Sequence, residues 1–198
     1  ADYADPNSPT DNTIADIVED KNGELWFCGF FYGLTKYNEK TGRFKKYRQP
    51  TIDNFQFYGI NDGLKDKVGN LWFATAGRGL ANYVYDKDSF ALFYPQPDKC
   101  KDGSKRGENY VTGICEDRND SDILWVTTYV GFYSFNKKTK AFTYYPSGIK
   151  VSYATDINFT SCVAGNAGNI WLGAYDEGLI CFNTVTKKFA HEKRKTFP

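Results

Sequence analysis

The residues that could contact a ligand stand in short segments between hydrophobic runs, where aromatic and charged side chains occur together. An aromatic ring can stack on the C–H face of a sugar, and arginine or carboxylate groups can hydrogen-bond its hydroxyls. The ligand-binding candidates are Phe31, Tyr32, Arg78, Tyr129, Tyr175, Asp176 and Glu177. Further polar candidates are Asp53, Asn54, Asp156 and Asn158. The alternative is that the aromatics pack between neighbouring structural units or against further domains.

A catalytic arrangement is harder to find among the same residues. Glycosidases use paired carboxylates at a defined separation, whereas Asp176 and Glu177 are adjacent and point apart in an extended segment. The single histidine, His191, lies near the end of the chain and is expected at the surface. No Gly-x-Ser-x-Gly elbow or phosphate-binding loop occurs. The sequence therefore predicts a protein that is not an enzyme, with a glycosidase or lyase as the alternative.

The cysteines predict no metal site and no cofactor. None of the five forms a Cys-x-x-Cys pair, and only one histidine accompanies them. Four lie in hydrophobic surroundings and are expected to be buried, whereas Cys100 lies in a polar segment. An odd number also argues against a complete disulfide framework. The other four are Cys28, Cys115, Cys162 and Cys181.

Charge and hydropathy exclude several kinds of partner. The formal net charge is +1, from 25 basic and 24 acidic residues, so nothing indicates binding to nucleic acid. No run approaches the roughly 18 apolar residues of a membrane span, and no signal peptide is recognisable. The sequence begins at Ala1 and contains no methionine, so we expect a processed or excised piece.

The elements that position the candidate residues follow from a repeat. Aromatic residues reach 18% of the chain and glycines number 18, a composition typical of strands and tight turns. The tryptophans are separated by 46, 53 and 46 residues. Periods of this length indicate a solenoid or a propeller. The four tryptophans are Trp26, Trp72, Trp125 and Trp171.

Further markers keep register with each tryptophan. An aspartate precedes it in three copies, at Asp20, Asp66 and Asp117, and Gly165 replaces the aspartate in the fourth. Because aspartate and glycine are the residues of tight turns, these positions predict turns rather than catalysis. A glycine follows each tryptophan, at Gly33, Gly79, Gly131 and Gly178.

Each copy divides into four short strands, in the first copy at residues 13–19, 24–29, 34–38 and 44–48. A single four-stranded meander cannot bury both faces, but copies stacked around an axis can, as in a β-propeller. We therefore predict an all-β, four-bladed domain over residues 1–198, as a small closed ring or a partial propeller. The expected blades cover about residues 12–50, 54–96, 109–147 and 154–194. A stretched solenoid is the competing architecture.

The stretch IADIVEDKNGELWFCGFFYGLTKYNEKTGRFKKY resembles the two-component regulator propeller repeat, whose pattern is I-x-x-I-x-E-D-x-x-G-x-L-W-F-G-T, then G-L, then Y-N. The usual Gly-Thr pair is replaced by Cys28–Gly29 in this copy, and the resemblance is looser in copies three and four. The matching residues of the first copy are Ile14, Ile17, Glu19, Asp20, Gly23, Leu25, Trp26, Phe27, Gly33, Leu34, Tyr37 and Asn38.

The resemblance implies the periplasmic sensor region of a hybrid histidine kinase/response regulator of the Bacteroides type. Such sensors typically respond to oligosaccharides, so it implies a sugar ligand and signalling through a membrane-anchored protein. Full sensors of this type carry more repeats, an immunoglobulin-like module, a membrane span and a kinase, which this sequence lacks. We therefore expect a fragment of a sensor or a short relative. Its expected partners are further blades or sensor domains, and a homodimer is a further option. An interaction module without a small ligand is the alternative function.

Overall fold

The computed structural model of the chain describes residues 5, 7–47, 59–96, 107, 109–149 and 156–192. These residues form sixteen strands joined by turns, and the described part contains no helix. No segment of it is therefore a helix that could cross a membrane. The predicted all-β class is confirmed.

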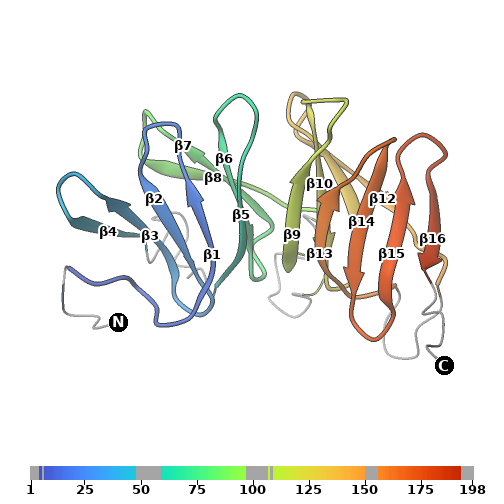
Figure 1. The fold of residues 1–198 in the computed structure, drawn as a ribbon, viewed down its shortest axis with the longest axis horizontal. Coiled ribbons are helices and arrows are strands. Elements are labelled where there is room, and N and C mark those ends of the chain that lie inside the picture. The colour runs from blue at the N-terminus through green and yellow to red at the C-terminus, as the bar shows by residue number, and fades with distance from the viewer. Residues whose placement is uncertain are drawn as a thin grey trace. The chain divides into compact units, whose positions relative to one another are not determined.

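The strands form four antiparallel sheets, here called blades, and each blade contains four consecutive strands in chain order (Figure 1). Blade 1 consists of β1 (Ile14–Glu19), β2 (Leu25–Gly29), β3 (Gly33–Asn38) and β4 (Arg43–Tyr47). Blade 2 consists of β5 (Ile60–Lys65), β6 (Leu71–Thr75), β7 (Leu80–Val84) and β8 (Ser89–Phe93). Blade 3 consists of β9 (Val111–Glu116), β10 (Ile123–Thr128), β11 (Gly131–Asn136) and β12 (Ala141–Tyr145). Blade 4 consists of β13 (Phe159–Ala164), β14 (Asn169–Ala174), β15 (Gly178–Asn183) and β16 (Lys188–Glu192).

The predicted strands of the first copy differ from the observed ones by about one residue at their ends, and Arg48 lies outside the described residues. The chain divides into two compact units, residues 1–111 and 112–198. The first unit contains blades 1 and 2, and the second contains blades 3 and 4 apart from Val111. The single-domain organisation stays a prediction, and each unit is described by itself.

The alternation of side chains along each strand gives every blade two different faces. We call the side that carries the tryptophan the Trp face and the opposite side the Phe face. In blade 1, Val18, Trp26 and Lys36 lie side by side across β1, β2 and β3, so they share the Trp face. Leu25, Tyr37 and Phe44 lie side by side in the same way and share the Phe face.

The core of the first unit forms where the Trp face of blade 1 meets the Phe face of blade 2. The Trp26 ring lies 4.6 Å from the Tyr83 ring and 5.6 Å from the Phe73 ring, centroid to centroid. β1 approaches β5 so closely that a Cβ on Gly63 would lie 2.9 Å from Val18 Cγ1. Each of these two faces would be exposed to solvent in an isolated sheet. In this unit they cover each other.

The second unit repeats this contact between blades 3 and 4. Trp125 and Phe132 stack with 5.3 Å between ring centroids, and Phe182 of blade 4 lies 5.3 Å from Trp125. At the neighbouring edge, the Thr112 hydroxyl donates to the Phe159 carbonyl at 2.6 Å. The same pairing of a Trp face with a Phe face therefore builds both cores.

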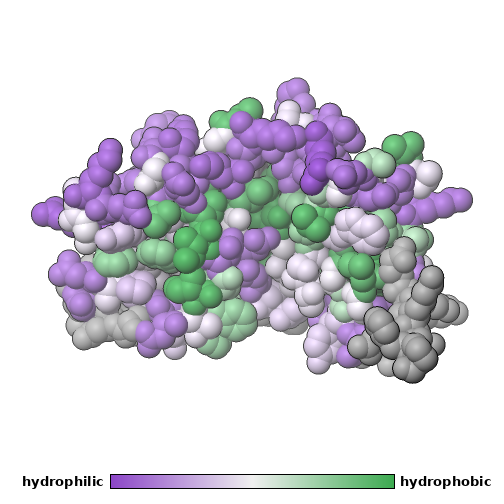
Figure 2. Space-filling view, viewed as in Figure 1, coloured by the Kyte–Doolittle hydropathy of each residue, from purple (hydrophilic) through white to green (hydrophobic). Residues whose placement is uncertain are grey.

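Hydrophobic side chains are exposed on one face of blade 1 and on one face of blade 4. The Phe face of blade 1 is partly exposed, and Figure 2 shows a band of hydrophobic side chains over β1, where Ile14 and Ile17 are exposed. The Trp face of blade 4 is also partly exposed, at Val163, Trp171 and Leu179.

Candidate functional site

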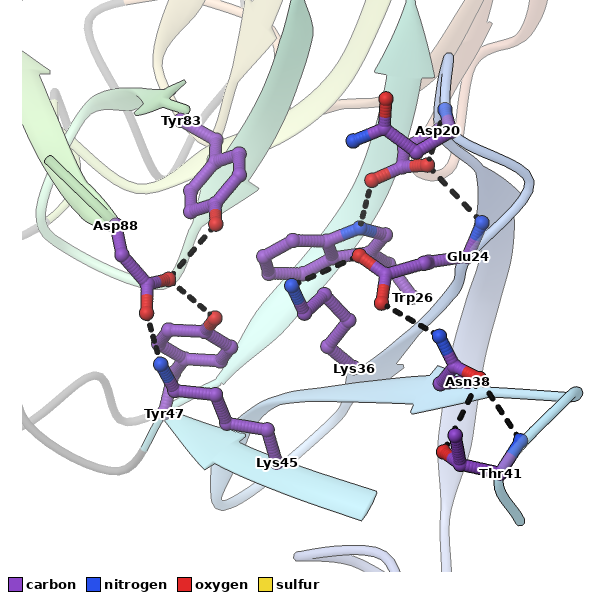
Figure 3. Close-up of polar contacts among 11 residues, drawn as sticks. Asp20, Glu24, Trp26, Lys36, Asn38, Thr41, Lys45, Tyr47, Tyr83 and Asp88 are labelled. Carbon is purple, nitrogen blue, oxygen red and sulfur yellow. Dashed lines mark hydrogen bonds and ion pairs between the residues drawn. The ribbon is translucent and has the colours of Figure 1, made fainter. Parts of the chain in front are cut away.

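In blades 1, 2 and 3 the turn that precedes the tryptophan is tied to the indole ring by its aspartate, as Figure 3 shows for blade 1. Asp20 Oδ1 accepts the backbone N–H groups of Asn22 at 2.8 Å and Glu24 at 3.0 Å. Its Oδ2 accepts the Trp26 indole N–H at 3.2 Å. Asp66 with Trp72 and Asp117 with Trp125 repeat the indole contact at 3.1 and 2.7 Å. These carboxylates are buried and fully engaged in holding turns, so they present no free group to a ligand.

The candidate ligand loops lie at the opposite end of the blades, where the second and third strands join. In blade 1 this loop contains Phe30, Phe31 and Tyr32, whose rings are all exposed. The buried carboxylate of Asp11 accepts the N–H of Phe31 at 2.6 Å and that of Tyr32 at 3.1 Å. The loop therefore holds exposed aromatic rings on a backbone that is fixed from beneath.

The corresponding loop of blade 2 holds Arg78. Its N–H donates to the Thr75 hydroxyl at 2.9 Å, and its side chain is partly buried. Gly59 lies between this loop and that of blade 1. Its carbonyl accepts the Ala76 N–H at 2.9 Å, and a Cβ added to it would lie 2.0 Å from the Phe30 carbonyl oxygen. Arg78 therefore belongs to the same end of the unit as Phe31 and Tyr32.

The glycines after these loops lie at the start of the third strands or directly before it, and they have positive φ angles. At Gly79 φ is 71°, and a Cβ would lie 2.2 Å from the Phe93 carbonyl oxygen. Only glycine tolerates both the left-handed backbone and this close approach. Gly33, Gly131 and Gly178 have φ angles of 89°, 155° and 74°.

In the second unit the loop of blade 3 contains Tyr129 and Val130. The Tyr129 side chain is exposed, and the Thr128 hydroxyl accepts the Val130 N–H at 3.3 Å. A Cβ on Gly131 would lie 2.7 Å from the Tyr144 ring, so the loop returns closely over blade 3. Tyr129 is thus held outward at the same end of its blade as the other candidates.

The loop of blade 4 carries three of the sequence candidates, Tyr175, Asp176 and Glu177. Tyr175 is exposed, and its N–H donates to the Asn158 carbonyl at 2.9 Å, which places the further candidate Asn158 beneath the loop. Asp176 has a φ of 63°, a left-handed conformation that a non-glycine residue adopts at a tight turn. The loop between β14 and β15 and the segment at Asn158 that leads into β13 therefore form one local cluster in blade 4.

His191 joins this cluster, although nothing near it in the sequence indicates a partner. Its Nε2 lies 2.6 Å from the Glu177 carbonyl oxygen and 3.8 Å from a Glu177 carboxylate oxygen. The contact arises because β16 pairs with β15, which places His191 opposite Ile180. The pair of His191 and Glu177 is not apparent from the sequence, because the two residues are brought together by the register of β15 and β16.

Asp156 has a structural position rather than an open one. Its buried carboxylate accepts the Tyr144 hydroxyl at 2.5 Å, the Ile157 N–H at 2.8 Å and the Ser147 hydroxyl. Burial, followed by the hydrogen bond to Asp156, raises the pKa of Tyr144. Asp156 therefore ties the last strand of blade 3 to the entry of blade 4. The candidates Asp53 and Asn54 lie outside the described residues.

A polar cluster that the sequence analysis missed joins blades 1 and 2 at their outer strands (Figure 3). The Asp88 carboxylate accepts the hydroxyls of Tyr47 at 2.5 Å and Tyr83 at 2.7 Å, and it also pairs with Lys45. Burial raises the pKa of Tyr47, and the Tyr83 hydroxyl adds to this effect. The Asp88 carboxylate, the Lys45 ammonium and the two tyrosine hydroxyls are bonding partners of one another. The cluster therefore holds blades 1 and 2 together and is not a binding site.

The described residues contain no cluster of histidine, cysteine and carboxylate groups able to hold a metal ion. Cys28, Cys115 and Cys181 are buried and Cys162 is partly buried. Burial raises the pKa of the Cys28 thiol well above its usual value, which makes it an unreactive core residue. Cys100 lies outside the described residues.

Comparison with known proteins places this geometry in context. Residues 8–31 match the family model described as "Two component regulator propeller". The structure is similar to the extracellular domain of the hybrid two component system BT3049 from B. thetaiotaomicron, with 25% identity and a TM-score of 0.73. That match covers 93% of this chain and 25% of the other. A comparison with curated protein sequences found no match.

Two further structures support the fold alone. The extracellular domain of the one component system BT4673 from B. thetaiotaomicron is 23% identical with a TM-score of 0.71, over 91% of this chain and 25% of that one. Streptogramin B lyase is 19% identical with a TM-score of 0.65, over 92% of this chain and 55% of that one. The chain spans 25% of the length of these two extracellular domains. The predicted resemblance and the all-β propeller fold are confirmed.

Proposed function

Because the chain carries a two-component regulator propeller repeat and shares the fold of sensor extracellular domains, we propose that it is a ligand-sensing propeller segment that recognises oligosaccharides. In this proposal the segment is not catalytic and works outside the cytoplasm, in the periplasm, as part of a membrane-anchored sensor. Its partners are further blades or sensor domains of a longer protein, and a homodimer of the sensor.

One observation carries the sugar proposal. Phe31 and Tyr32 expose their rings on a loop whose backbone is held by the buried Asp11 carboxylate. An exposed aromatic pair on a fixed backbone loses little conformational entropy on binding. Such rings suit the C–H faces of sugar rings, and Arg78 at the same end supplies hydrogen-bond donors. In the second unit Tyr175 and Glu177 form a similar combination.

Signalling follows if the ligand prefers one arrangement of the sensor over another. A ligand shifts such an equilibrium only by the difference between its affinities for the two states. Loops at one end of neighbouring blades fit this role. A bound oligosaccharide that bridges two loops favours the arrangement in which both loops contact it. The segment itself needs no chemical step.

Calorimetric titration of the chain with a panel of plant and host oligosaccharides tests the proposal. We expect binding heat for at least one class of sugar. Tyr32→Ala and Tyr175→Ala each remove one exposed ring, and each is expected to weaken binding about tenfold, equivalent to about 1.4 kcal/mol. Circular dichroism checks that both variants keep the fold.

Val68→Ala and Val185→Ala are matched controls, because both residues are exposed in turns at the other end of their blades. They are expected to bind like the parent chain. Absence of heat across the panel from a folded chain would favour an interaction module instead. Equal affinity of the two tyrosine variants and the parent would remove these loops from the site.

A catalytic alternative is favoured by one feature, the pairing of His191 with Glu177 beside the exposed Tyr175. A histidine held by a hydrogen bond to a backbone carbonyl, with a carboxylate nearby, can act as a general base. The likeness to streptogramin B lyase concerns the fold alone. Chromatography after incubation with the same panel separates the two functions, since a sensor leaves every sugar intact and an enzyme forms product that His191→Ala abolishes.

A further inference from the structure

The loop between β14 and β15 is joined to the last strand of its own blade by two ionisable residues. His191 Nε2 on β16 lies 2.6 Å from the carbonyl oxygen of Glu177 and 3.8 Å from an oxygen of the Glu177 carboxylate. The two side chains are 28% and 30% exposed. Solvent therefore reaches both groups, so each can exchange protons with it.

The position of His191 is set by packing within the second unit. His191 is paired with Ile180, and Phe189, two residues before it on β16, is paired with Phe182. These side chains therefore share the Phe face of blade 4. The Phe182 ring on this face lies 5.3 Å from the Trp125 ring of blade 3. The contact with Glu177 thus forms beside the core that joins blades 3 and 4.

The other blades place different residues at these two positions. In blade 3 a Cβ on Gly131 would lie 2.7 Å from the Tyr144 ring, so the position equivalent to His191 reaches the loop there as well. The repeat therefore supplies the contact, and blade 4 fills it with an acid and a histidine. The equivalents of Glu177 are Tyr32, Arg78 and Val130, and those of His191 are Lys46, Leu92 and Tyr144.

The short contact defines how His191 takes up a proton. A carbonyl oxygen only accepts hydrogen bonds, so Nε2 carries the proton of the neutral imidazole and Nδ1 receives the second one. Histidine changes charge between about pH 5 and 8, whereas glutamate stays ionised across this range. In mild acid the imidazolium donates a charge-assisted hydrogen bond to the carbonyl and also attracts the carboxylate. Both changes tighten the same contact.

The elements packed against His191 bring no opposing charge. Among the strands of blades 3 and 4, only β9 and β16 contain charged residues, and Glu116 of β9 is paired with Lys137 at the other end of blade 3. Asp176, exposed in the same loop, has the same sign of charge as Glu177. The Asp156 carboxylate is bonded to the Tyr144 and Ser147 hydroxyls. The loop thus adds only negative charge near the imidazole.

Two lysines at the start of β16 are the described positive groups nearest to His191 along the chain. Lys188 is exposed, and Lys187 places its Nζ 5.5 Å from the ring centroids of Trp125 and Tyr145. Four residues of strand separate the backbones of Lys187 and His191 by about 13 Å. This exceeds the Debye length of about 8 Å at physiological salt, so the repulsion is largely screened.

We propose that His191 is a pH switch for the β14–β15 loop. In mild acid the imidazolium binds both the carbonyl and the carboxylate of Glu177 and holds the loop against β16. Above neutral pH only the neutral hydrogen bond to the carbonyl remains, so the loop opens more often and Tyr175 and Asp176 are less restrained. This inference concerns the loop itself and does not depend on the sugar-sensing function.

NMR spectroscopy of the full chain tests the switch, because His191 is the single histidine and its imidazole signals are unambiguous. We expect a proton on Nε2 alone at about pH 7.5 and on both nitrogens at about pH 5.5. The Tyr175 N–H donates to the Asn158 carbonyl, so its hydrogen exchange reports on loop opening. Its protection, relative to an unprotected peptide at the same pH, is expected to rise about fivefold between these two pH values.

Three variants separate the contributions to this rise. His191→Gln keeps a donor for the carbonyl but has no charge at either pH, so its Tyr175 protection should not change. Glu177→Gln keeps the carbonyl and loses the carboxylate, so its rise should be only about twofold. Lys188→Gln removes a charge at the exposed start of β16 and is the matched control, which should respond like the parent. The Val130 N–H of blade 3, bonded to Thr128, is the internal control and should show no rise.

Several results would overturn the proposal. Constant Tyr175 protection while the imidazole gains its second proton would show that the charge does not hold the loop. An imidazole that keeps one charge state over this range, or that carries its proton on Nδ1 alone at about pH 7.5, would remove the basis of the switch. A parent-like pH response in His191→Gln would assign the effect to another group.

Discussion

The Asp88 carboxylate of blade 2 accepts the hydroxyl hydrogen of Tyr47 from blade 1, with 2.5 Å between the two oxygen atoms. Asp88 occupies the last position of the β7–β8 turn, with a left-handed φ of 47°. Lys187 takes the equivalent position in blade 4, with a φ of 57°, and its Nζ lies 5.5 Å from the ring centroids of Trp125 and Tyr145. The same turn position thus reaches the preceding blade in both units through opposite charges.

Asp88→Ala is expected to destabilise the first unit. The substitution leaves the partly buried hydroxyls of Tyr47 and Tyr83 without their acceptor, which costs about 1–3 kcal/mol of unfolding free energy. Urea denaturation followed by circular dichroism measures the change. Asp86→Ala, at an exposed position of the same turn, is the matched control and should leave the midpoint unchanged. Equal midpoints for both variants would contradict the stabilising role of the Asp88 contacts.

Alkaline pH is expected to weaken the fold through its tyrosines. Burial and then the negative charge of Asp20 raise the pKa of Tyr85 from 10.0 to about 12. Because the folded state favours the neutral phenol, this contribution to stability is full below pH 10 and is lost as the pH rises through about 12. Denaturation midpoints measured across this pH range check the prediction. Tyr85→Phe is expected to lose less stability than the parent as the pH rises. A Tyr175→Phe control should behave like the parent, since Tyr175 is exposed.

Asp117→Ala is expected to loosen the turn and the tryptophan of blade 3 together. The carboxylate accepts the buried Trp125 indole N–H at 2.7 Å and the Asn119 N–H at 2.8 Å, so both donors lose their partner. The expected loss is about 1–3 kcal/mol of unfolding free energy. Asp122→Ala, in the same turn, removes only a more exposed pair with Lys138 and should cost less than about 1 kcal/mol. The reverse order of stability would show that the indole contact is dispensable.

Asp11→Asn is expected to release the loop that carries the candidate aromatic residues. An amide side chain offers one acceptor oxygen instead of two, so the N–H groups of Phe31, Tyr32 and Thr13 cannot all keep their bonds. Amide hydrogen exchange followed by NMR should become faster at Phe31 and Tyr32. Exchange at Tyr175 should not change, because its N–H bonds to Asn158 in the other unit. Unchanged exchange at Phe31 would mean that the loop holds its own conformation.

Much of the fold was predictable because it depends on residues close together in the chain. The spacing of Trp26 and Trp72 and the turn residues before them located strands to within about one residue in the first copy. The loops that hold Tyr32 and Tyr175 were likewise placed between strands correctly. Their role in ligand binding stays a prediction.

The surroundings of the candidate residues were less predictable. Asp156 lay among the open candidates, yet its carboxylate is buried by Tyr144 and Ser147. His191 had no visible partner in the sequence, and pairing of β16 with β15 brings it to Glu177. Asp11 received no role, although an aspartate that bonds the backbone two residues on, as Asp11 does with Thr13, is a common turn signal. Each contact joins segments that only the strand register brings together.

The sequence by itself determined where strands begin and turns form, because alternation, glycine and aspartate act over a few residues. Only the tertiary structure decided which copies of an equivalent side chain are covered. Phe44 and Phe90 hold the same place in the repeat, yet Phe90 is buried and Phe44 is partly exposed. The physical reason is that burial of a sheet face requires a second sheet, and nothing within a single repeat encodes whether that neighbour is present.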